Sequence, residues 1–263
     1  MPFPDSDRVI YEHNPLEEVI CQLRFPTILE IGVDEPAAFQ KLIRSEYPLY
    51  RKEDPGADLP PELGALISNF PLSAFPRPAE RTTHKFLTAD SKRSVSLTRD
   101  FVAVADSHYT RWEELRAEIL RARRALEEVY EPAFYTRVGL RYRNVIDRDR
   151  LKLAGTSWEE LLKPALAGPL GAGQIRTQVR ETRSQVRIEL DNVSGGTVML
   201  RHGLVTRAGQ EPAYLIDADF FTQERNSGDD TVGSLDAFNR LGGNLFRWAI
   251  TDRLHMALDP RGP

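Results

Sequence analysis

The sequence predicts an α+β protein whose first half is ferredoxin-like and whose second half is an antiparallel sheet followed by a long C-terminal helix. Three observations carry this prediction: a long amphipathic helix that leads directly into an alternating strand, a βαββαβ order of elements before residue 150, and four strand-like segments after it. We expect two domains, a ferredoxin-like α+β domain at residues 1–150 and an antiparallel β-sheet with a C-terminal helix at residues 151–263.

The best-defined unit runs from residue 110 to residue 146. Its helix has one apolar stripe, in which apolar residues recur at steps of three and four: Trp112, Leu115, Ile119, Ala122, Leu126 and Val129. Thr110 and Glu113 have the spacing of a capping box, and Pro132 closes the helix. The residues that follow alternate between apolar and polar side chains up to Ile146, which is typical of a strand with one buried face.

The elements before this unit complete the ferredoxin-like order. Residues 17–26 are predicted to form the first strand, and residues 35–47 a helix. Residues 84–90 and 94–106 are expected to pair as a hairpin. Between the helix and the hairpin, residues 51–81 are a proline-rich segment with a short helix expected near residues 62–69, and long connections of this kind are usually functional or mobile.

The second half is predicted to be rich in strands. After a glycine-rich hinge at residues 168–173, residues 174–181 and 184–191 are expected to form a hairpin. Two further strands are expected at residues 197–207 and 213–223. Ser157 and Glu160 form a second capping box, which predicts a short helix before the hinge.

A terminal helix is predicted from a cap at Ser234 to about Leu258. It is apolar on two stripes, and such a helix is packed from two sides or covered by a partner chain. We therefore expect a homodimer formed through this helix, with contacts from Phe246, Trp248 and Ile250. The adjacent glycines at positions 242 and 243 each cost about 1 kcal/mol relative to alanine, which indicates a close backbone approach or a break in the helix.

Composition limits the classes of function. With 41% hydrophobic and 28% charged residues the chain is typical of a globular protein, and its net charge of −4 argues against a general nucleic-acid coat protein. The single cysteine, Cys21, lies in an apolar run and is expected to be an inert buried thiol. The histidines stand apart in the sequence, so we expect neither a metal nor a cofactor. Without a spanning apolar stretch or a signal peptide, a cytoplasmic location and no membrane partner are expected.

Arginines gather on the polar face of the strand that ends at Ile146 and on the segments that follow it. If these strands adjoin, they form a basic surface that binds a protein partner, phosphates or nucleic acid, made of Arg137, Arg141, Arg143, Arg176, Arg180 and Arg187. Gly139 lies within this row and would let another backbone or a base approach closely. The alternative is internal pairing across strands with the protein's own carboxylates: Glu181, Glu189, Asp217 and Asp219.

Asp217 and Asp219 form an acidic pair on one side of a predicted strand. Paired carboxylates at this spacing can hold a hard cation or share general acid–base work. No third ligand stands near them in sequence, so partnership with the arginine face is the favoured interpretation. The sequence assigns no catalytic residue, because it contains no recognisable nucleophile, metal or phosphate-loop motif.

Three clusters of residues together resemble a sporadically distributed, uncharacterised bacterial protein family of about this length. They are HNPLEEVICQLRF near the start, LRYRNVI in the middle, and LIDADFF followed by FRWAITDRLHMAL near the end. The family's opening motif is Asn-Pro-Pro-Leu-x-Glu-Val followed by Arg-Phe. This chain departs from it, because Leu16 directly follows Asn14 and Pro15. The resemblance implies an accessory gene, with a role in antiviral defence or in a mobile element, and it implies no catalytic residues.

The favoured function is a non-enzymatic binding or assembly protein that acts through protein–protein interaction. The alternative is an RNA-binding or RNA-processing module, because tandem ferredoxin-like domains occur in CRISPR-associated RNA processors, and this argument rests on fold analogy. In the first case the arginine face binds a protein, and in the second it binds nucleic acid.

Overall fold

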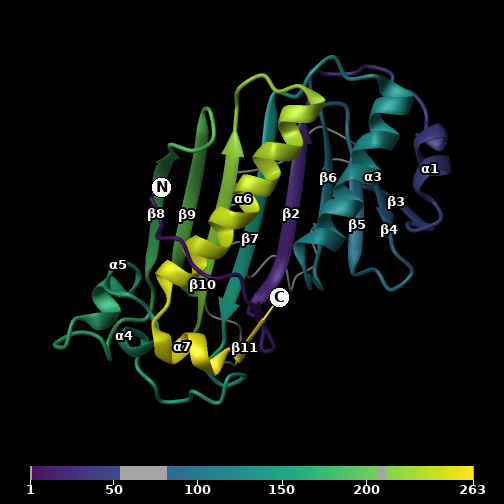
Figure 1. Ribbon diagram of the computed structural model, residues 1–263. Helices are drawn as coiled ribbons and strands as arrows, with labels where there is room; N and C mark the ends of the chain where they lie inside the picture. Colours follow the sequence, from purple (N-terminus) through teal and green to yellow (C-terminus); the bar gives the residue numbers. More distant parts are fainter. Residues whose placement is uncertain (1, 54–81, 206–210, 263) are drawn as a thin grey trace.

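The computed structural model describes residues 2–53, 82–205 and 211–262 (Figure 1). The expected short helix near residues 62–69 lies outside these ranges. The elements, with their bounds, are β1 (Ile10–Tyr11), β2 (Leu16–Arg24), α1 (Ala37–Ile43), β3 (Leu49–Glu53), β4 (Thr83–Leu87), β5 (Arg93–Leu97), β6 (Phe101–Asp106), α3 (Trp112–Tyr130), β7 (Arg137–Ile146), α4 (Trp158–Leu161), α5 (Pro164–Ala167), the 3₁₀ helix η1 (Gly168–Gly171), β8 (Arg183–Leu190), β9 (Gly196–Val205), β10 (Ala213–Thr222), α6 (Gly228–Ala249), α7 (Asp252–Ala257) and β11 (Pro260–Arg261).

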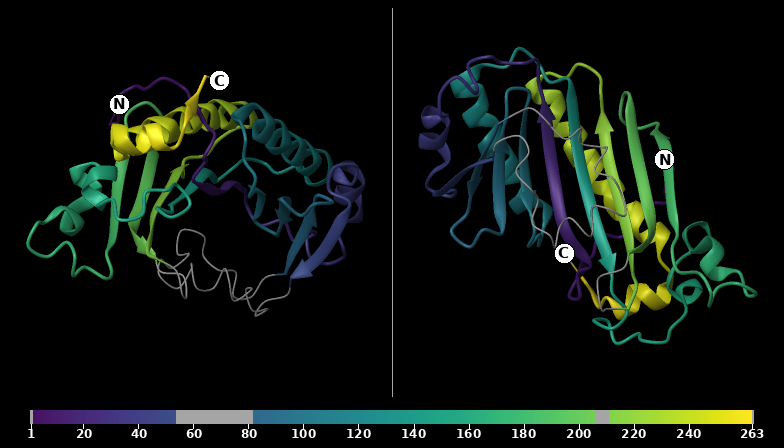
Figure 2. Two further views of the ribbon diagram at one scale, coloured as in Figure 1. Left: turned by 90° about the horizontal axis from the view of Figure 1, so that it is seen from below. Right: turned by 180° about the vertical axis from the view of Figure 1, so that it is seen from behind.

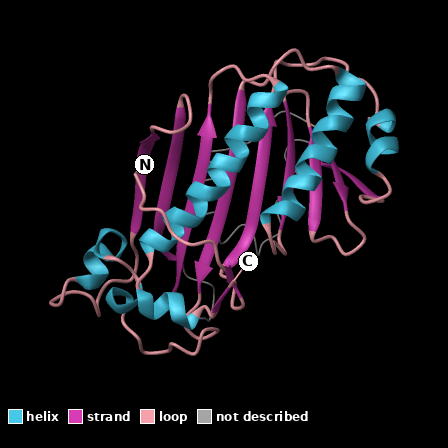
Figure 3. Cartoon of the chain, viewed as in Figure 1, coloured by secondary structure: helices cyan, strands magenta, loops and turns pink. Residues whose placement is uncertain are grey.

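The protein is an α+β fold built on one antiparallel sheet. Its strand order is β3-β4-β5-β6-β2-β7-β10-β9-β8, while β1 and β11 pair separately. The long helices α3 and α6 both lie on the same face of this sheet (Figure 3). The sheet is bent like an arch, with these helices over its outer side (Figure 2). The two predicted halves are therefore joined through one continuous sheet.

The chain contains an internal repeat that the sequence analysis did not detect. The first repeat comprises β2, α1, β3–β6 and α3, and the second comprises β7, α4, α5, β8–β10 and α6. In each repeat the first strand pairs with the last strand before the long helix, so that the sheet reads β4-β5-β6-β2 followed by its mirror order, β7-β10-β9-β8. The strand β3 extends the first repeat by one edge strand.

The strand registers align the two repeats residue by residue. Each long helix begins six residues after the preceding strand ends, at Trp112 and Gly228. The last residues of those strands, Asp106 and Thr222, pair with Val19 and Val138, which are therefore equivalent positions. Two residues further on, the equivalent positions Cys21 and Leu140 pair with each other. The pseudo-twofold axis that relates the repeats thus passes through the Cys21–Leu140 pair.

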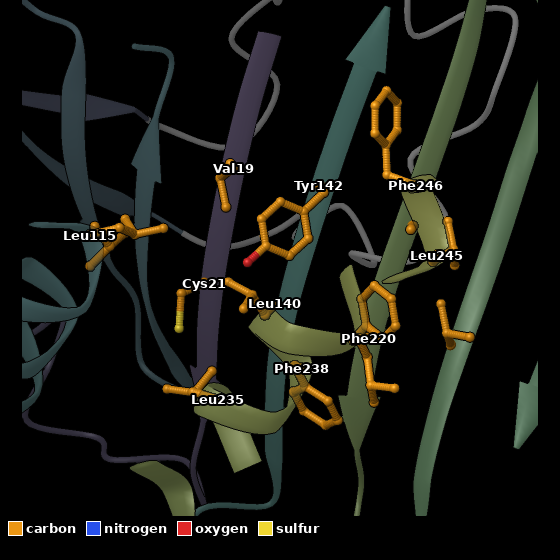
Figure 4. Close-up of a cluster of buried hydrophobic side chains, with 14 of the residues drawn as sticks. Val19, Cys21, Leu115, Leu140, Tyr142, Phe220, Leu235, Phe238, Leu245 and Phe246 are labelled. Atoms are coloured by element: carbon orange, nitrogen blue, oxygen red, sulfur yellow. The ribbon is translucent and has the colours of Figure 1, made fainter. Parts of the chain in front are cut away.

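The core lies between the sheet and the two long helices. Apolar side chains from both repeats meet there, including Val19, Cys21, Leu115, Leu140, Tyr142, Phe220, Leu235, Phe238, Leu245 and Phe246 (Figure 4). Phe220 of β10 and Phe238 of α6 lie with their ring centroids 6.2 Å apart. Burial raises the pKa of the Cys21 thiol to about 12, so the cysteine is a neutral core residue at physiological pH.

The first 150 residues contain more strands than the four-stranded motif that we expected. The predicted strand at residues 94–106 is two strands, because Thr98 and Asp100 form a turn in which the Thr98 hydroxyl accepts from the Asp100 amide. The edge strand β3 follows α1. The α+β class and the mostly antiparallel sheet are confirmed, and the chain has the expected long helix near its C-terminus.

Several predicted boundaries are wrong for local reasons. Residues 174–178 form turns and residues 179–181 are irregular, so the predicted strand is absent there, and β8 pairs instead with β9. The terminal helix begins after a cap at Ser227, whose hydroxyl accepts from the Asp230 amide, rather than at Ser234. It ends at Ala249, because Ile250 is extended and forms a bridge with Leu162.

The two predicted capping boxes have different outcomes. At Ser157 the reciprocal capping box with Glu160 is present. At the start of α3 the N-cap is Arg111, and no side chain caps the helix. Glu113 instead forms an ion pair with Arg8 of the N-terminal arm, with 2.6 Å between the guanidinium nitrogen and the carboxylate oxygen.

The two adjacent glycines of α6 differ in their surroundings. A Cβ added to Gly242 would lie 2.7 Å from a ring carbon of Tyr142, whereas a Cβ added to Gly243 would meet nothing within 4 Å. The predicted close approach is therefore present at Gly242, and α6 continues through both positions.

We expect Gly242→Ala to destabilise the protein by about 1–3 kcal/mol, because overpacking forces the buried Tyr142 ring to move. The matched control, Gly243→Ala, should stabilise it by about 1 kcal/mol, because alanine is the better helix former and finds open space there. Urea unfolding of the two variants measures both effects. Equal stabilisation by the two substitutions would contradict the close approach.

Candidate functional site

Charged side chains extend from β2 of the first repeat across the strands of the second repeat, on the sheet face that α3 and α6 do not cover. The ladder registers place Glu18, Arg143, Asp217, Arg201 and Gln185 side by side on the five consecutive strands β2, β7, β10, β9 and β8. Arg141, Asp219 and Arg137 lie on the same face. We call the seven ionised members of this set the charged network: Glu18, Arg137, Arg141, Arg143, Arg201, Asp217 and Asp219.

The centre of the charged network is a bidentate ion pair between Arg141 and Asp217. Arg141 donates through Nε and Nη2 to the two carboxylate oxygens, at 2.6 and 2.5 Å. Both side chains are almost fully buried, with 4% and 1% of their surface exposed. Next to it, Arg143 donates to Glu18 at 3.1 Å. Strong bidentate geometry offsets the cost of removing both charges from water.

Arg137 forms a second buried pair, with Asp219. Its Nη2 donates to both carboxylate oxygens of Asp219, at 2.9 and 3.0 Å, and its Nη1 donates to Gln22. The guanidinium lies directly over Gly139, where a side chain would collide with it, and 4.8 Å from the ring centroid of Phe221. Gly139 therefore makes room for Arg137, which replaces our interpretation that it admits a partner's backbone or a base.

Burial and charge oppose each other at Asp219. Burial raises the pKa of its carboxyl, while the nearby Arg137 and Arg141 guanidinium groups act in the opposite direction. The net effect is a raised pKa, so burial outweighs the attraction of the two arginines. Within the described chain, no group of three metal-ligating side chains occurs, and both aspartates are occupied by arginines rather than by a shared cation site.

Arg201 is the least satisfied member of the charged network. Its Nε donates to Gln185 at 3.1 Å, and its Nη1 lies 3.8 Å from Asp217, beyond hydrogen-bond distance. This Nη1 is buried and has no hydrogen-bond partner among the described residues. The pKa of Arg201 is lowered, chiefly by burial and also by repulsion from Arg141 and Arg137, against the attraction of the nearby aspartates.

The charges of the charged network do not cancel. Counted over the described residues, it contains four arginines and three carboxylates, which leaves one positive charge in excess. The arginine that lacks a dedicated carboxylate is Arg201, because Asp217 already makes two hydrogen bonds with Arg141. A buried cation without full compensation is costly, and such groups are enriched at functional sites.

The first repeat provides an internal comparison for this network. The positions equivalent to Asp217 and Asp219 are Phe101 and Ala103. When the register of β5 is extended by one residue, the counterpart of Arg201 is Thr98, in the turn between β5 and β6, whose amide donates to the Phe101 carbonyl. The first repeat therefore forms the same arrangement of strands and long helix without charges at these three positions, although it keeps Arg24 at the position equivalent to Arg143, where it pairs with Asp100. Asp217, Asp219 and Arg201 are thus additions of the second repeat to the shared scaffold.

The other predicted arginines are only partly brought together. Arg187 lies on β8 opposite Met199, exposed and on the face of the charged network. Arg176 and Arg180 lie in the turns before β8, where Arg176 pairs with Glu159 and Arg180 donates to the Thr177 carbonyl. Sequence reasoning missed Arg201, although the alternation of residues 197–205 around it signals a strand whose polar positions share a face.

The protein's own N-terminal arm contacts one residue from each apolar stripe of the terminal helix. Trp248 packs on Phe3 with 5.4 Å between ring centroids, and Phe246 packs on Tyr11 at 5.8 Å. Ile250 is fully buried. These contacts within one chain cover the apolar residues that we expected a partner to cover. A homodimer through α6 therefore stays a prediction, but an uncovered apolar surface no longer supports it.

Comparisons with known proteins do not assign the chain to a family. Neither the family models nor the curated proteins include a match to this sequence. In the described chain no helix is both long enough and apolar enough to cross a membrane.

We expect Asp217→Asn to destabilise the protein by about 3–5 kcal/mol, because it leaves Arg141 and Arg201 buried without their shared carboxylate. The matched control is Glu159→Gln, which removes the partner of the exposed Arg176 and should cost about 1 kcal/mol or less. Denaturant unfolding at neutral pH measures the two changes. Similar small losses in the free energy of unfolding for both variants would show that the buried ion pair stabilises the protein no more than the exposed one.

Proposed function

We propose that the protein is a non-enzymatic binding or assembly protein that holds an acidic segment of a protein partner against the charged network. The observation that carries this proposal is the surplus arginine of the second repeat, compared with its absence at the equivalent positions of the first repeat. The first repeat forms the same scaffold with no charge at the positions of Asp217, Asp219 and Arg201, so the scaffold itself does not require these three charges. A partner that supplies a negative charge accounts for them.

The balance of charges favours a protein partner over a nucleic acid. Binding to a phosphate backbone depends on many cations whose charges are not already neutralised. Here Arg137, Arg141 and Arg143 each have a carboxylate within the chain, and the surplus is a single charge. The whole chain carries a net charge of −4, which repels a polyanion.

The edge strand β8 offers a route for an extended segment to this face. It is the last strand of the sheet, and its polar-face residues Gln185 and Arg187 are exposed. Val186, on the other side of the same strand, is 43% exposed. An edge strand can pair with an added strand through its outward backbone groups. A partner strand that alternates acidic and apolar residues would match both faces of β8.

The biological setting of this proposal rests on the resemblance of the three sequence clusters to a sporadically distributed bacterial family. Genes with such a distribution belong to accessory functions, so we propose an accessory component of a bacterial defence or mobile-element system, acting in the cytoplasm. The partner is then a protein encoded by the same system.

The alternative function is an RNA-binding or RNA-processing module of the tandem ferredoxin-like type. One observation favours it: β7, β2, β6 and β5 lie in the order of a split βαβ motif, with α1 and α3 as its helices. This support is fold analogy, and it does not identify an RNA-contacting residue.

A binding assay separates the two proposals. We expect a fluorescein-labelled oligo-glutamate peptide to bind and Arg187→Glu to weaken this binding by about 1 kcal/mol, since an exposed charge near the site contributes about that much. The matched control, Arg180→Glu, reverses an exposed charge in the turn before β8 and should have no effect. Fluorescence anisotropy at low salt measures both.

Other outcomes of the same assay count against the proposal. If labelled oligouridine binds more tightly than the peptide, and purified protein shows a high ratio of absorbance at 260 to 280 nm, the RNA alternative replaces it. If neither probe binds, the face is not a docking surface for an anionic partner.

A further inference from the structure

We infer that Arg201 and Gln185 form a binding site for a single carboxylate group, supplied by an acidic side chain or a chain terminus of a partner. This inference rests on the proposed function and names the chemistry that the charged network recognises. The site lies where β9 meets the edge strand β8, at the point where the network has a donor without an acceptor.

Arg201 has a buried hydrogen-bond donor, its Nη1. Arg201 has 5% of its side-chain surface exposed, and its Nη1 has no hydrogen-bond acceptor among the described residues. A buried polar group without a partner costs free energy, and native proteins rarely keep one without a reason. Asp217 does not satisfy this nitrogen, since its nearest oxygen is 3.8 Å away and its carboxylate is held by Arg141.

A second donor lies beside the first. Arginine only donates hydrogen bonds, so the atom of Gln185 that accepts from Arg201 Nε is the amide oxygen. The Gln185 amide nitrogen, which makes no hydrogen bond within the described chain, is thereby oriented as a donor near the guanidinium. Gln185 is exposed on the edge strand, so a ligand reaches the pair from the side of β8.

Charge limits the ligand to a monoanion. The charged network has a surplus of one positive charge, which one carboxylate neutralises. A phosphate dianion would leave a net negative charge next to Asp217, which lies 3.8 Å from the same guanidinium nitrogen. A planar carboxylate also matches the planar donor fork of arginine. The site therefore takes a carboxylate in preference to a phosphate or a cation.

The electrostatic surroundings of Arg201 agree with this geometry. Its pKa is lowered by burial and by repulsion from Arg141 and Arg137, so its positive charge is less stable there than in water. A bound carboxylate would relieve that repulsion. The first repeat has Thr98 at the corresponding position and therefore does not repeat this site.

The test uses sodium acetate as the probe, with thermal unfolding and acetate methyl saturation-transfer NMR as measurements. At constant ionic strength set with sodium chloride, acetate should raise the unfolding midpoint of the wild-type protein to a saturating level, because a ligand that binds only the folded state stabilises it. Arg201→Gln should abolish the shift and the saturation transfer, and Gln185→Ala should reduce both. Arg176→Gln, which removes an exposed arginine elsewhere, should behave as wild type.

Three results overturn the inference: no saturable effect of acetate on the wild-type protein, an effect that persists in Arg201→Gln, or a response to inorganic phosphate but not to acetate. Failure here is distinguishable from failure of the proposed function. If the oligo-glutamate peptide still binds in an Arg187-dependent way while acetate has no effect, the docking face stands and the carboxylate site at Arg201 fails.

Discussion

The pairing of β2 with β7 is the interaction on which the rest of the structure depends. These strands are the first strands of the two repeats, and they pair around the Cys21–Leu140 position that lies on the pseudo-twofold axis. Their ladder makes one sheet from two halves and places α3 and α6 on the same face. One shared core follows, with Val19, Leu140 and Tyr142 at its centre, and the opposite face is left for polar side chains (Figure 4).

The opposite face shows how the two repeats differ in chemistry while they share a scaffold. The first repeat has Phe101 and Ala103 where the second has Asp217 and Asp219, and the backbone pairing is the same. Buried ion pairs contribute little net stability compared with apolar residues of similar size, because desolvation offsets their attraction. This small net contribution is consistent with our proposal that the charged network serves recognition. Arg201 is the member of the charged network whose hydrogen-bonding groups are least satisfied by contacts within the protein.

Local patterns in the sequence predicted the elements that local physics determines. The apolar stripe of α3 and the capping box at Ser157 are found in the structure, and β7 is a strand as predicted. The expectation that only one face of β7 is buried is wrong, because the ion pairs bury its arginine face as well. Long-range features were not predictable: that residues 174–181 would form no strand, and that the N-terminal arm would cover Trp248, both depend on packing between distant segments. The repeat could not be recognised from the sequence, because equivalent core positions share apolar character and spacing but not residue type, as in Val104 and Phe220. On the polar face, equivalent positions such as those of Asp217 and Phe101 do not share even their polarity. Internal pairing of the arginines with Asp217 and Asp219 was one of two alternatives that the sequence left open, and the structure shows Arg141 paired with Asp217. The position of Arg201 beside Asp217 could be established only from the register of β9.

The most direct test of this account is the free energy of unfolding of Arg201→Gln compared with that of Arg141→Gln, measured in chloride buffer without carboxylates. Arg141→Gln removes the partner of the buried Asp217 and should lose about 3–5 kcal/mol. Arg201→Gln removes a buried cation that repels its neighbours, and glutamine at this position can still bond to Gln185. The account predicts that this variant is as stable as the wild-type protein or more stable, as expected for a residue kept for binding. A loss as large as that of Arg141→Gln would contradict the account and make Arg201 a structural part of the sheet.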